Sequence, residues 1–145
     1  MLINIAGHDV TNKTDMLELK DLKYVHYRNL DTCEKNAYFL KNIEFENCFV
    51  ETLFYMHRDT GLINNIVINN GSNTLLTHSK NRSKKKQEIR YNKNCEMLRD
   101  YYGPPSEEAE DYILYQFKDG DISCKKIMTG PHRYADGYVY VNFYK

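Results

Sequence analysis

The stretch AYFLKNIEFENCFVETLFYMHRDTGLINNIVI, residues 37–68, predicts three consecutive antiparallel strands. Apolar side chains occupy odd positions over most of 37–45 and even positions over 48–56, and an alternation with a period of two is typical of strands. The change of parity marks a turn between the first two strands. Turn residues at 58–61 precede a third apolar run at 62–68. Because the second strand is apolar on both faces, we expect it in the middle of a sheet that is covered on each side.

A long helix is predicted over residues 83–102, downstream of these strands. Ser83 can cap its N-terminus, and Gly103 followed by two prolines can end it. At about 100° per residue, one side of the helix is apolar, and it carries Tyr91, Cys95, Leu98 and Tyr102. We expect the basic residues to face solvent, namely Lys84, Lys85, Lys86, Arg90 and Lys93. Lysines in the first turn oppose the helix dipole, so the helix could instead begin near Gln87.

The rest of the chain adds strands at both ends. Residues 2–5 predict a short strand that ends at the Gly7 turn, and residues 106–111 read as an acidic connector. Three later strands are expected, at 112–117, 122–128 and 138–144, and Asp119 and Gly120 should form the centre of the turn between the first two. Residues 15–28 fit either a short helix or a strand.

These elements predict one α+β domain over residues 1–145. We expect a single antiparallel sheet of about six strands, largely in meander order, with the helix at 83–102 packed on one face. The predicted core consists of Phe39, Ile43, Phe45, Val50, Phe54, Ile66, Ile68, Leu98, Ile113, Phe117, Val139, Val141 and Phe143.

Composition excludes several classes of protein. The 20 basic and 20 acidic residues give a net charge of zero, which argues against a whole-domain polyelectrolyte binder. No stretch approaches the roughly 20 apolar residues of a membrane span, and the start of the chain lacks a secretory signal. We therefore expect a cytoplasmic protein without membrane contact, and its Asn-rich, Lys-rich and Tyr-rich composition suggests a bacterial gene of low GC content. The four cysteines lack metal-ligand spacing, so reduced and mostly buried thiols are expected.

Enzyme signatures are absent from the sequence. It contains no glycine-rich phosphate loop, zinc-protease motif or nucleophile elbow, and we expect no cofactor, no metal and no catalytic residue. One enzymatic alternative stays open: His57, His132 and Arg133 lie in predicted loops and could serve a small metal-independent ribonuclease or toxin domain.

Charge is strongly segregated along the chain. Residues 78–94 carry seven Lys or Arg against one Glu, a net charge of +6, and residues 106–121 carry six acids against one Lys, a net charge of −5. The basic segment offers a second alternative, a nucleic-acid-binding regulator that uses residues 84–93. We consider nucleic acid an improbable partner because the aromatic residues of the helix are predicted to point inward.

Tyrosines on the last strand favour a protein partner. If the valine side of this strand is core, Tyr138, Tyr140 and Tyr144 are partly exposed unless another layer covers them. Tyrosine is common in protein interfaces, and cross-strand packing on a sheet face is the equally weighted alternative. The leading hypothesis is a small non-enzymatic bacterial binding protein that occludes its partner, as an immunity protein neutralises a toxin, for example a nuclease with a basic cleft. A homodimer through the tyrosine face is the competing arrangement. The predicted partner-binding residues are Glu107, Glu108, Glu110, Asp111, Tyr112, Asp119, Asp121, Tyr138, Tyr140 and Tyr144.

Overall fold

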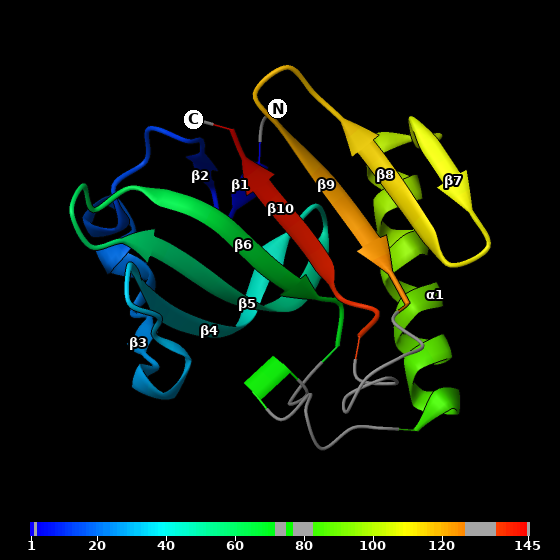
Figure 1. Ribbon diagram of the computed structural model, residues 1–145, viewed down its shortest axis with the longest axis horizontal. Coiled ribbons are helices and arrows are strands. Elements are labelled where there is room, and N and C mark those ends of the chain that lie inside the picture. The colour runs from blue at the N-terminus through cyan, green and yellow to red at the C-terminus, as the bar shows by residue number, and fades with distance from the viewer. Residues whose placement is uncertain (2, 72–74, 77–82, 127–135, 145) are drawn as a thin grey trace.

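The computed structural model describes residues 1, 3–71, 75–76, 83–126 and 136–144. Within these residues the chain forms ten β-strands, one long α-helix and short 3-10 helices (Figure 1). In chain order the elements are β1 (Ile3–Ile5), β2 (His8–Val10), η1 (Met16–Leu22), β3 (Val25–His26), η2 (Arg28–Leu30), β4 (Lys35–Phe45), β5 (Cys48–His57), β6 (Ile63–Asn69), α1 (Lys84–Tyr102), β7 (Glu107–Ala109), β8 (Tyr112–Gln116), β9 (Gly120–Lys125) and β10 (Val139–Phe143).

All ten strands belong to one open antiparallel sheet. Its order is β2-β1-β4-β5-β6-β10-β9-β8-β7, and β3 pairs with part of β4. The predicted meander of three strands is confirmed as β4, β5 and β6. After β6 the chain passes through α1 to the far edge at β7 and returns strand by strand until β10 pairs with β6 (Figure 1). This pairing joins the two halves of the sheet, which are β2-β1-β4-β5-β6 and β10-β9-β8-β7.

The sheet is larger than the predicted six or so strands because three short segments, β2, β3 and β7, also form strands. Ala6 and Gly7 have positive φ angles and turn the chain back, so His8 and Asp9 belong to β2 and not to a loop. The acidic connector is β7, whose Glu107 lies opposite Leu114 of β8. In the ambiguous segment at 15–28 both interpretations hold in part, since η1 is followed by the two-residue strand β3.

The predicted hairpin between β8 and β9 is present, but its turn is shifted by one residue. The Phe117 N–H donates to the Gly120 carbonyl at 2.9 Å, which places Lys118 and Asp119 at the centre. Gly120 is instead the first residue of β9, and a Cβ there would lie 2.2 Å from the carbonyl oxygen of Asn142 in β10. Close approach of the neighbouring strand therefore requires this glycine.

The core lies on both faces of the sheet. The main cluster joins the sheet to α1 and to N-terminal residues such as Ile3, Ile5 and Met16, and a smaller cluster on the other face contains Leu53, Val67, Leu75 and Tyr138. Ten of the thirteen predicted core residues are buried, and the other three, Phe39, Ile43 and Phe117, are partly buried. Residues 51–54 of β5 are all buried, which confirms a central strand covered on both sides.

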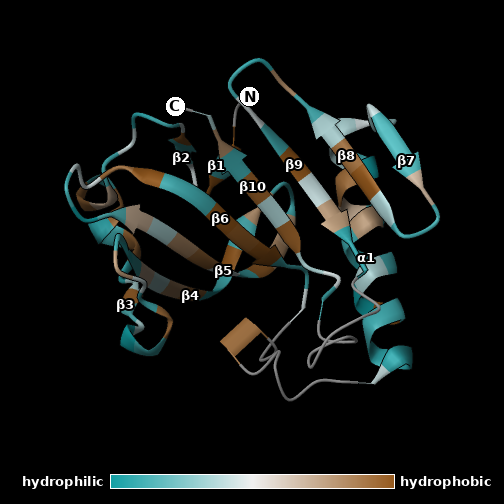
Figure 2. Ribbon diagram, viewed as in Figure 1, coloured by the Kyte–Doolittle hydropathy of each residue, from teal (hydrophilic) through white to brown (hydrophobic). Residues whose placement is uncertain are grey.

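Helix α1 confirms the predicted caps. The Ser83 hydroxyl accepts the Lys86 N–H at 3.3 Å, and Gly103 follows the last turn with a φ of 77°. Because the helix begins at Lys84, the later start near Gln87 is wrong. The predicted apolar side is confirmed, since Tyr91, Cys95 and Leu98 are buried and Tyr102 is partly buried. Figure 2 shows the first turns of α1 as hydrophilic, and Lys84, Lys85, Lys86 and Lys93 are exposed.

Candidate functional site

Arg90 does not belong to the exposed basic face. Its side chain is 8% exposed, and both Nε, at 3.1 Å, and Nη2 donate to the Asp136 carbonyl oxygen. The guanidinium group also lies 4.7 Å from the centre of the Tyr138 ring, a distance at which a cation and an aromatic ring attract. The prediction of a solvent-facing Arg90 is therefore wrong. Arg90 anchors the segment before β10, and the four lysines of the predicted basic face are the ones that stay exposed.

A polar stripe on α1 explains this burial. Gln87, Arg90 and Asn94 are all buried, and their spacing of three and four residues places them on one side of a helix. Asn94 is 0% exposed and binds two neighbouring strand ends: its Nδ2 donates to the Asn69 side-chain oxygen at 3.0 Å and to the Gly137 carbonyl at 2.8 Å. Its Oδ1 accepts the Asn70 N–H at 2.7 Å. The stripe fastens α1 to the end of β6 and the start of β10.

Two of the predicted partner-binding tyrosines lie in this buried region. Tyr138 is 1% exposed, and Tyr140 is partly buried against the smaller core cluster. Burial, followed by the nearby Asp136 carboxylate, raises the pKa of Tyr140. Burial also raises the pKa of Asp136, and the Gly137 N–H, which donates to this carboxylate at 2.7 Å, acts in the opposite direction. Tyr138 is not available as an exposed partner-binding residue, because a second cluster supplies the layer that covers this face.

A second group of predicted residues lies together on the β7–β8 hairpin at the sheet edge. Its four acidic residues are exposed, and they are Glu107, Glu108, Glu110 and Asp111. Arg99 of α1 forms an ion pair with Glu108, and the Tyr112 hydroxyl donates to Glu107. We call these four acids and Tyr112 the acidic hairpin.

The third group lies at the other end of β8 and β9. The Tyr144 hydroxyl donates to Asp121 at 2.9 Å, and the Asn142 amide donates to the second oxygen of this carboxylate at 3.1 Å. Asp119 accepts a hydrogen bond from the Met1 ammonium group at 2.6 Å, which lowers the pKa of this carboxyl group although burial acts in the opposite direction. The structure therefore divides the ten predicted residues among three places.

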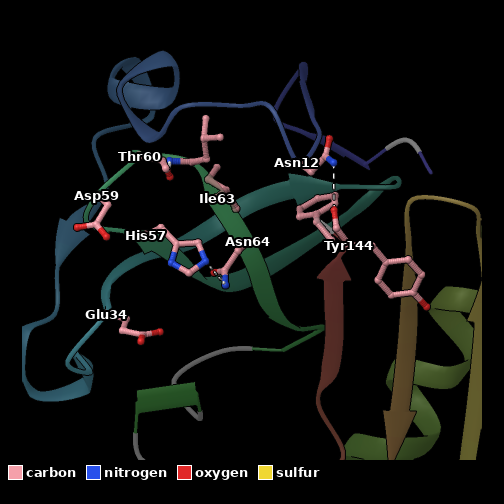
Figure 3. A pocket seen from close by; sticks show the side chains of 10 residues that line it. Asn12, Glu34, His57, Asp59, Thr60, Ile63, Asn64 and Tyr144 are labelled. Atoms are coloured by element: carbon pink, nitrogen blue, oxygen red, sulfur yellow. Dashed lines mark hydrogen bonds between the residues drawn. The ribbon is translucent and has the colours of Figure 1, made fainter.

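Tyr144 also lines a pocket that the sequence did not reveal. The pocket has a volume of about 620 Å³ (Figure 3), and its lining residues are Asn12, Glu34, His57, Asp59, Thr60, Leu62, Ile63, Asn64, Phe143 and Tyr144. They come from four separate parts of the chain, so no local motif could have indicated the site. We call it the His57 pocket.

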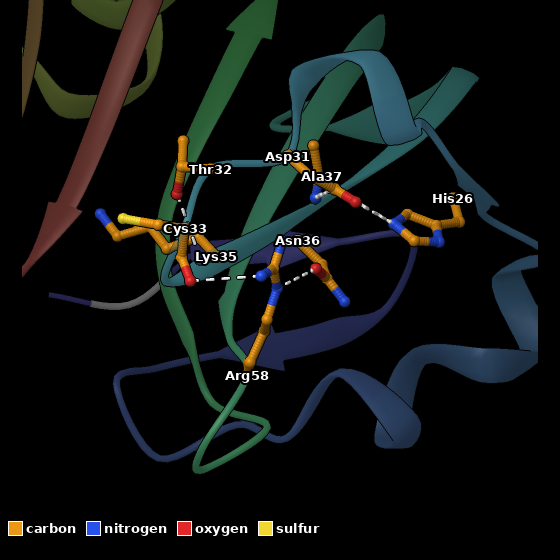
Figure 4. A network of polar contacts seen from close by, with 8 residues as sticks. All are labelled: His26, Asp31, Thr32, Cys33, Lys35, Asn36, Ala37 and Arg58. Carbon is orange, nitrogen blue, oxygen red and sulfur yellow. Dashed lines mark hydrogen bonds and ion pairs between the residues drawn. The ribbon is translucent and has the colours of Figure 1, made fainter.

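Arg58 follows His57 in the sequence but is bonded to a different segment. Its Nε donates to the Asn36 side-chain oxygen at 2.6 Å and its Nη1 to the Cys33 carbonyl at 3.2 Å (Figure 4). In the same network His26 contacts the Asp31 carboxylate at 2.8 Å, and the Ala37 N–H donates to it at 2.8 Å. Burial acts to raise the pKa of Asp31, but these two hydrogen bonds, together with the charges of His26 and Arg58, outweigh it and the pKa is lowered.

The remaining predicted groups are placed as follows. His57 lies in the pocket, whereas His132 and Arg133 lie outside the described residues. All four cysteines are free; Cys95 and Cys124 are buried, Cys48 is partly buried and Cys33 is exposed. Within the described ranges, no three His, Cys, Asp or Glu side chains are grouped so that they could hold a metal ion. None of the described helices has the length and apolar character needed to cross a membrane.

The site is described from its own geometry, because the chain has no matching relative. No protein-family model, curated protein or solved structure matches this chain. Fold and surface together define an α+β protein with an open antiparallel sheet. It has an acidic hairpin at the β7 edge of this sheet and a pocket at the end of β10.

Proposed function

We propose that this protein is a non-enzymatic bacterial binding protein that occludes a basic surface of a protein partner. The most concrete form is an immunity-type protein that neutralises a toxin such as a nuclease. The observation that carries the proposal is the acidic hairpin, which presents four exposed carboxylates within five residues. Among the described residues only Glu108 of these four forms an ion pair, with Arg99. Charges arranged in this way accelerate the encounter with an oppositely charged partner.

The position of the hairpin supports occlusion. β7 is the last strand of the sheet, so its outer edge is accessible to a large partner. Charged side chains on an edge strand resist indiscriminate pairing with other strands, and they favour a surface that supplies cations. A nuclease must hold phosphates with cationic groups, and exposed carboxylates compete for the same groups.

Affinity capture from the bacterium that encodes the protein tests this proposal. The triple variant E107Q/E110Q/D111N removes three charges from the acidic hairpin with little change of shape. E88Q/E96Q/D100N removes three exposed charges from α1 and is the matched control. We expect wild type and control to retain one protein in about equimolar amount, in a salt-sensitive manner, and the hairpin variant to bind at least about tenfold more weakly.

Two results would contradict the proposal. One is equal retention of the partner by the hairpin variant, which would show that this surface is not the interface. The other is cleavage of RNA by the purified protein in EDTA, with loss of cleavage in H57A. The second result would establish the ribonuclease alternative.

A further inference from the structure

The His57 pocket is held in shape by hydrogen bonds between distant segments. The Arg58 N–H donates to the Glu34 carbonyl at 3.1 Å, and the side-chain Nδ2 of Asn12 donates to the Tyr144 carbonyl at 3.1 Å. The Ile63 N–H donates to the Thr14 carbonyl at 3.0 Å. These bonds fix the start of β4, the turn before β6 and the end of β10 around one hollow (Figure 3). Such preorganisation lowers the entropy cost of binding a ligand.

Two carboxylates lie among the polar groups of this pocket. Glu34 and Asp59 contribute carboxylates, which only accept when ionised, and within the described part of the chain neither forms an ion pair. Asn64 Nδ2 lies 3.3 Å from His57 Nε2. Asn64 lines the same pocket, and this contact with His57 holds its side-chain amide in place.

The other walls are apolar. Leu62, Ile63 and Phe143 line the pocket, and none of its lining residues is Lys or Arg. Arg58, the nearest arginine in sequence, is bonded to Asn36 and Cys33 instead (Figure 4). A ligand that suits these walls has an apolar stem and a head that is positively charged and only donates hydrogen bonds.

We propose that the His57 pocket binds the guanidinium side chain of an arginine. Arginine offers five N–H donors in a planar fork and is less strongly hydrated than lysine, so it fits several acceptors at once, and its methylene groups can lie against Leu62 and Ile63. The inference rests on the proposed function in one respect, since the arginine would belong to the protein partner. The pocket itself can be tested without that partner.

Titration with a capped amino acid tests the pocket directly. Nα-acetyl-arginine amide is added to the ¹⁵N-labelled full chain, and backbone amide shifts are followed by NMR. We expect a Kd of about 1 mM, typical for a ligand of this size, with the largest shifts at Thr60, Leu62 and Asn64. Nα-acetyl-citrulline amide, which is neutral and nearly the same shape, should bind at least about tenfold more weakly.

A pair of variants tests the two carboxylates. E34Q/D59N should weaken arginine binding about tenfold, and E88Q/E96Q, with the same change of charge on α1, should leave it within about twofold of wild type. Equal binding of citrulline, equal loss in both variants, or shifts confined to other regions would overturn the inference. Thermal unfolding of each variant confirms that it is folded, which is expected because all four side chains are exposed.

The two proposals fail separately. If capped arginine does not bind but the hairpin variant loses the partner, the proposed function stands and the pocket is not an arginine site. If arginine binds and the hairpin variant retains the partner, the pocket stands and the acidic hairpin is not the interface.

Discussion

Replacing Asn94 by alanine tests whether the polar stripe of α1 holds the two halves of the sheet together. The side chain is fully buried and forms hydrogen bonds to Asn69, Asn70 and Gly137, with lengths from 2.7 to 3.0 Å. Truncation removes all three bonds at once. Because the partners lie at the end of β6 and the start of β10, the variant weakens the region where these strands meet the helix.

The expected loss in the free energy of unfolding depends on whether each hydrogen-bond partner of Asn94 can find another partner. A buried polar group that loses its partner costs about 1–3 kcal/mol. The Asn69 oxygen is buried and loses this donor; the Asn70 N–H is only partly buried and can bind water; and the Gly137 carbonyl keeps the Cys124 thiol at 3.3 Å. The sum is about 3 kcal/mol, from which the better helix propensity of alanine subtracts about 0.6 kcal/mol. We expect a net loss of about 2.5 kcal/mol, or roughly 8 °C in Tm.

Urea unfolding followed by far-UV circular dichroism measures this loss. Asn92 is exposed on the same helix, so N92A carries the same gain in propensity without the buried bonds and should be unchanged or slightly more stable. N94D keeps the shape and the acceptor for Asn70 but removes the donor, so it should lose at least as much stability as N94A. A loss in N94A of less than about 1 kcal/mol relative to N92A would refute the reasoning.

Two further predictions concern the strand contact at Gly120 and the carboxylate of Asp31. G120A should lose about 3 kcal/mol of stability, because its Cβ would meet the Asn142 carbonyl at 2.2 Å and the strands must separate; an unfolding midpoint within a degree of wild type would contradict this. The lowered pKa of Asp31 stabilises the fold above the unfolded-state value of about 4, and this contribution disappears as pH falls through the folded-state pKa. D31N, which cannot accept the Ala37 N–H and His26 as an anion does, should therefore be less stable than wild type at pH 7, with the gap narrowing as the pH falls through the folded-state pKa of Asp31. Urea unfolding at a series of acidic pH values checks this, and an unchanged gap would exclude the carboxylate as its source.

The local elements could be predicted because their signals lie in neighbouring residues. The change of parity between 37–45 and 48–56 is a property of two adjoining strands, and Glu46 and Asn47 both have the positive φ of the turn between them. The caps at Ser83 and Gly103 are equally local. The burial of Arg90 also has a signal in the sequence. Gln87, Arg90 and Asn94 are spaced as one helix stripe beside the apolar side, and polar residues in such a stripe can be buried when partners are present.

The clustering of carboxylates in the acidic hairpin could be predicted from the sequence, whereas the His57 pocket could not. The four carboxylates of the hairpin lie within five residues, so the sequence by itself determined that they would be near one another. The pocket draws on residues from Asn12 to Tyr144, and only the tertiary structure could bring these together. The decisive step is the pairing of β10 with β6, for example Val141 with Ile66, because it places Tyr144 near the end of β5, where His57 lies. Alternation shows which side of a strand is apolar but does not specify its neighbour, since many partners satisfy the same pattern. The packing of the whole core fixes the strand order. The strand order in turn determines the burial of Tyr138 and the shape of the pocket.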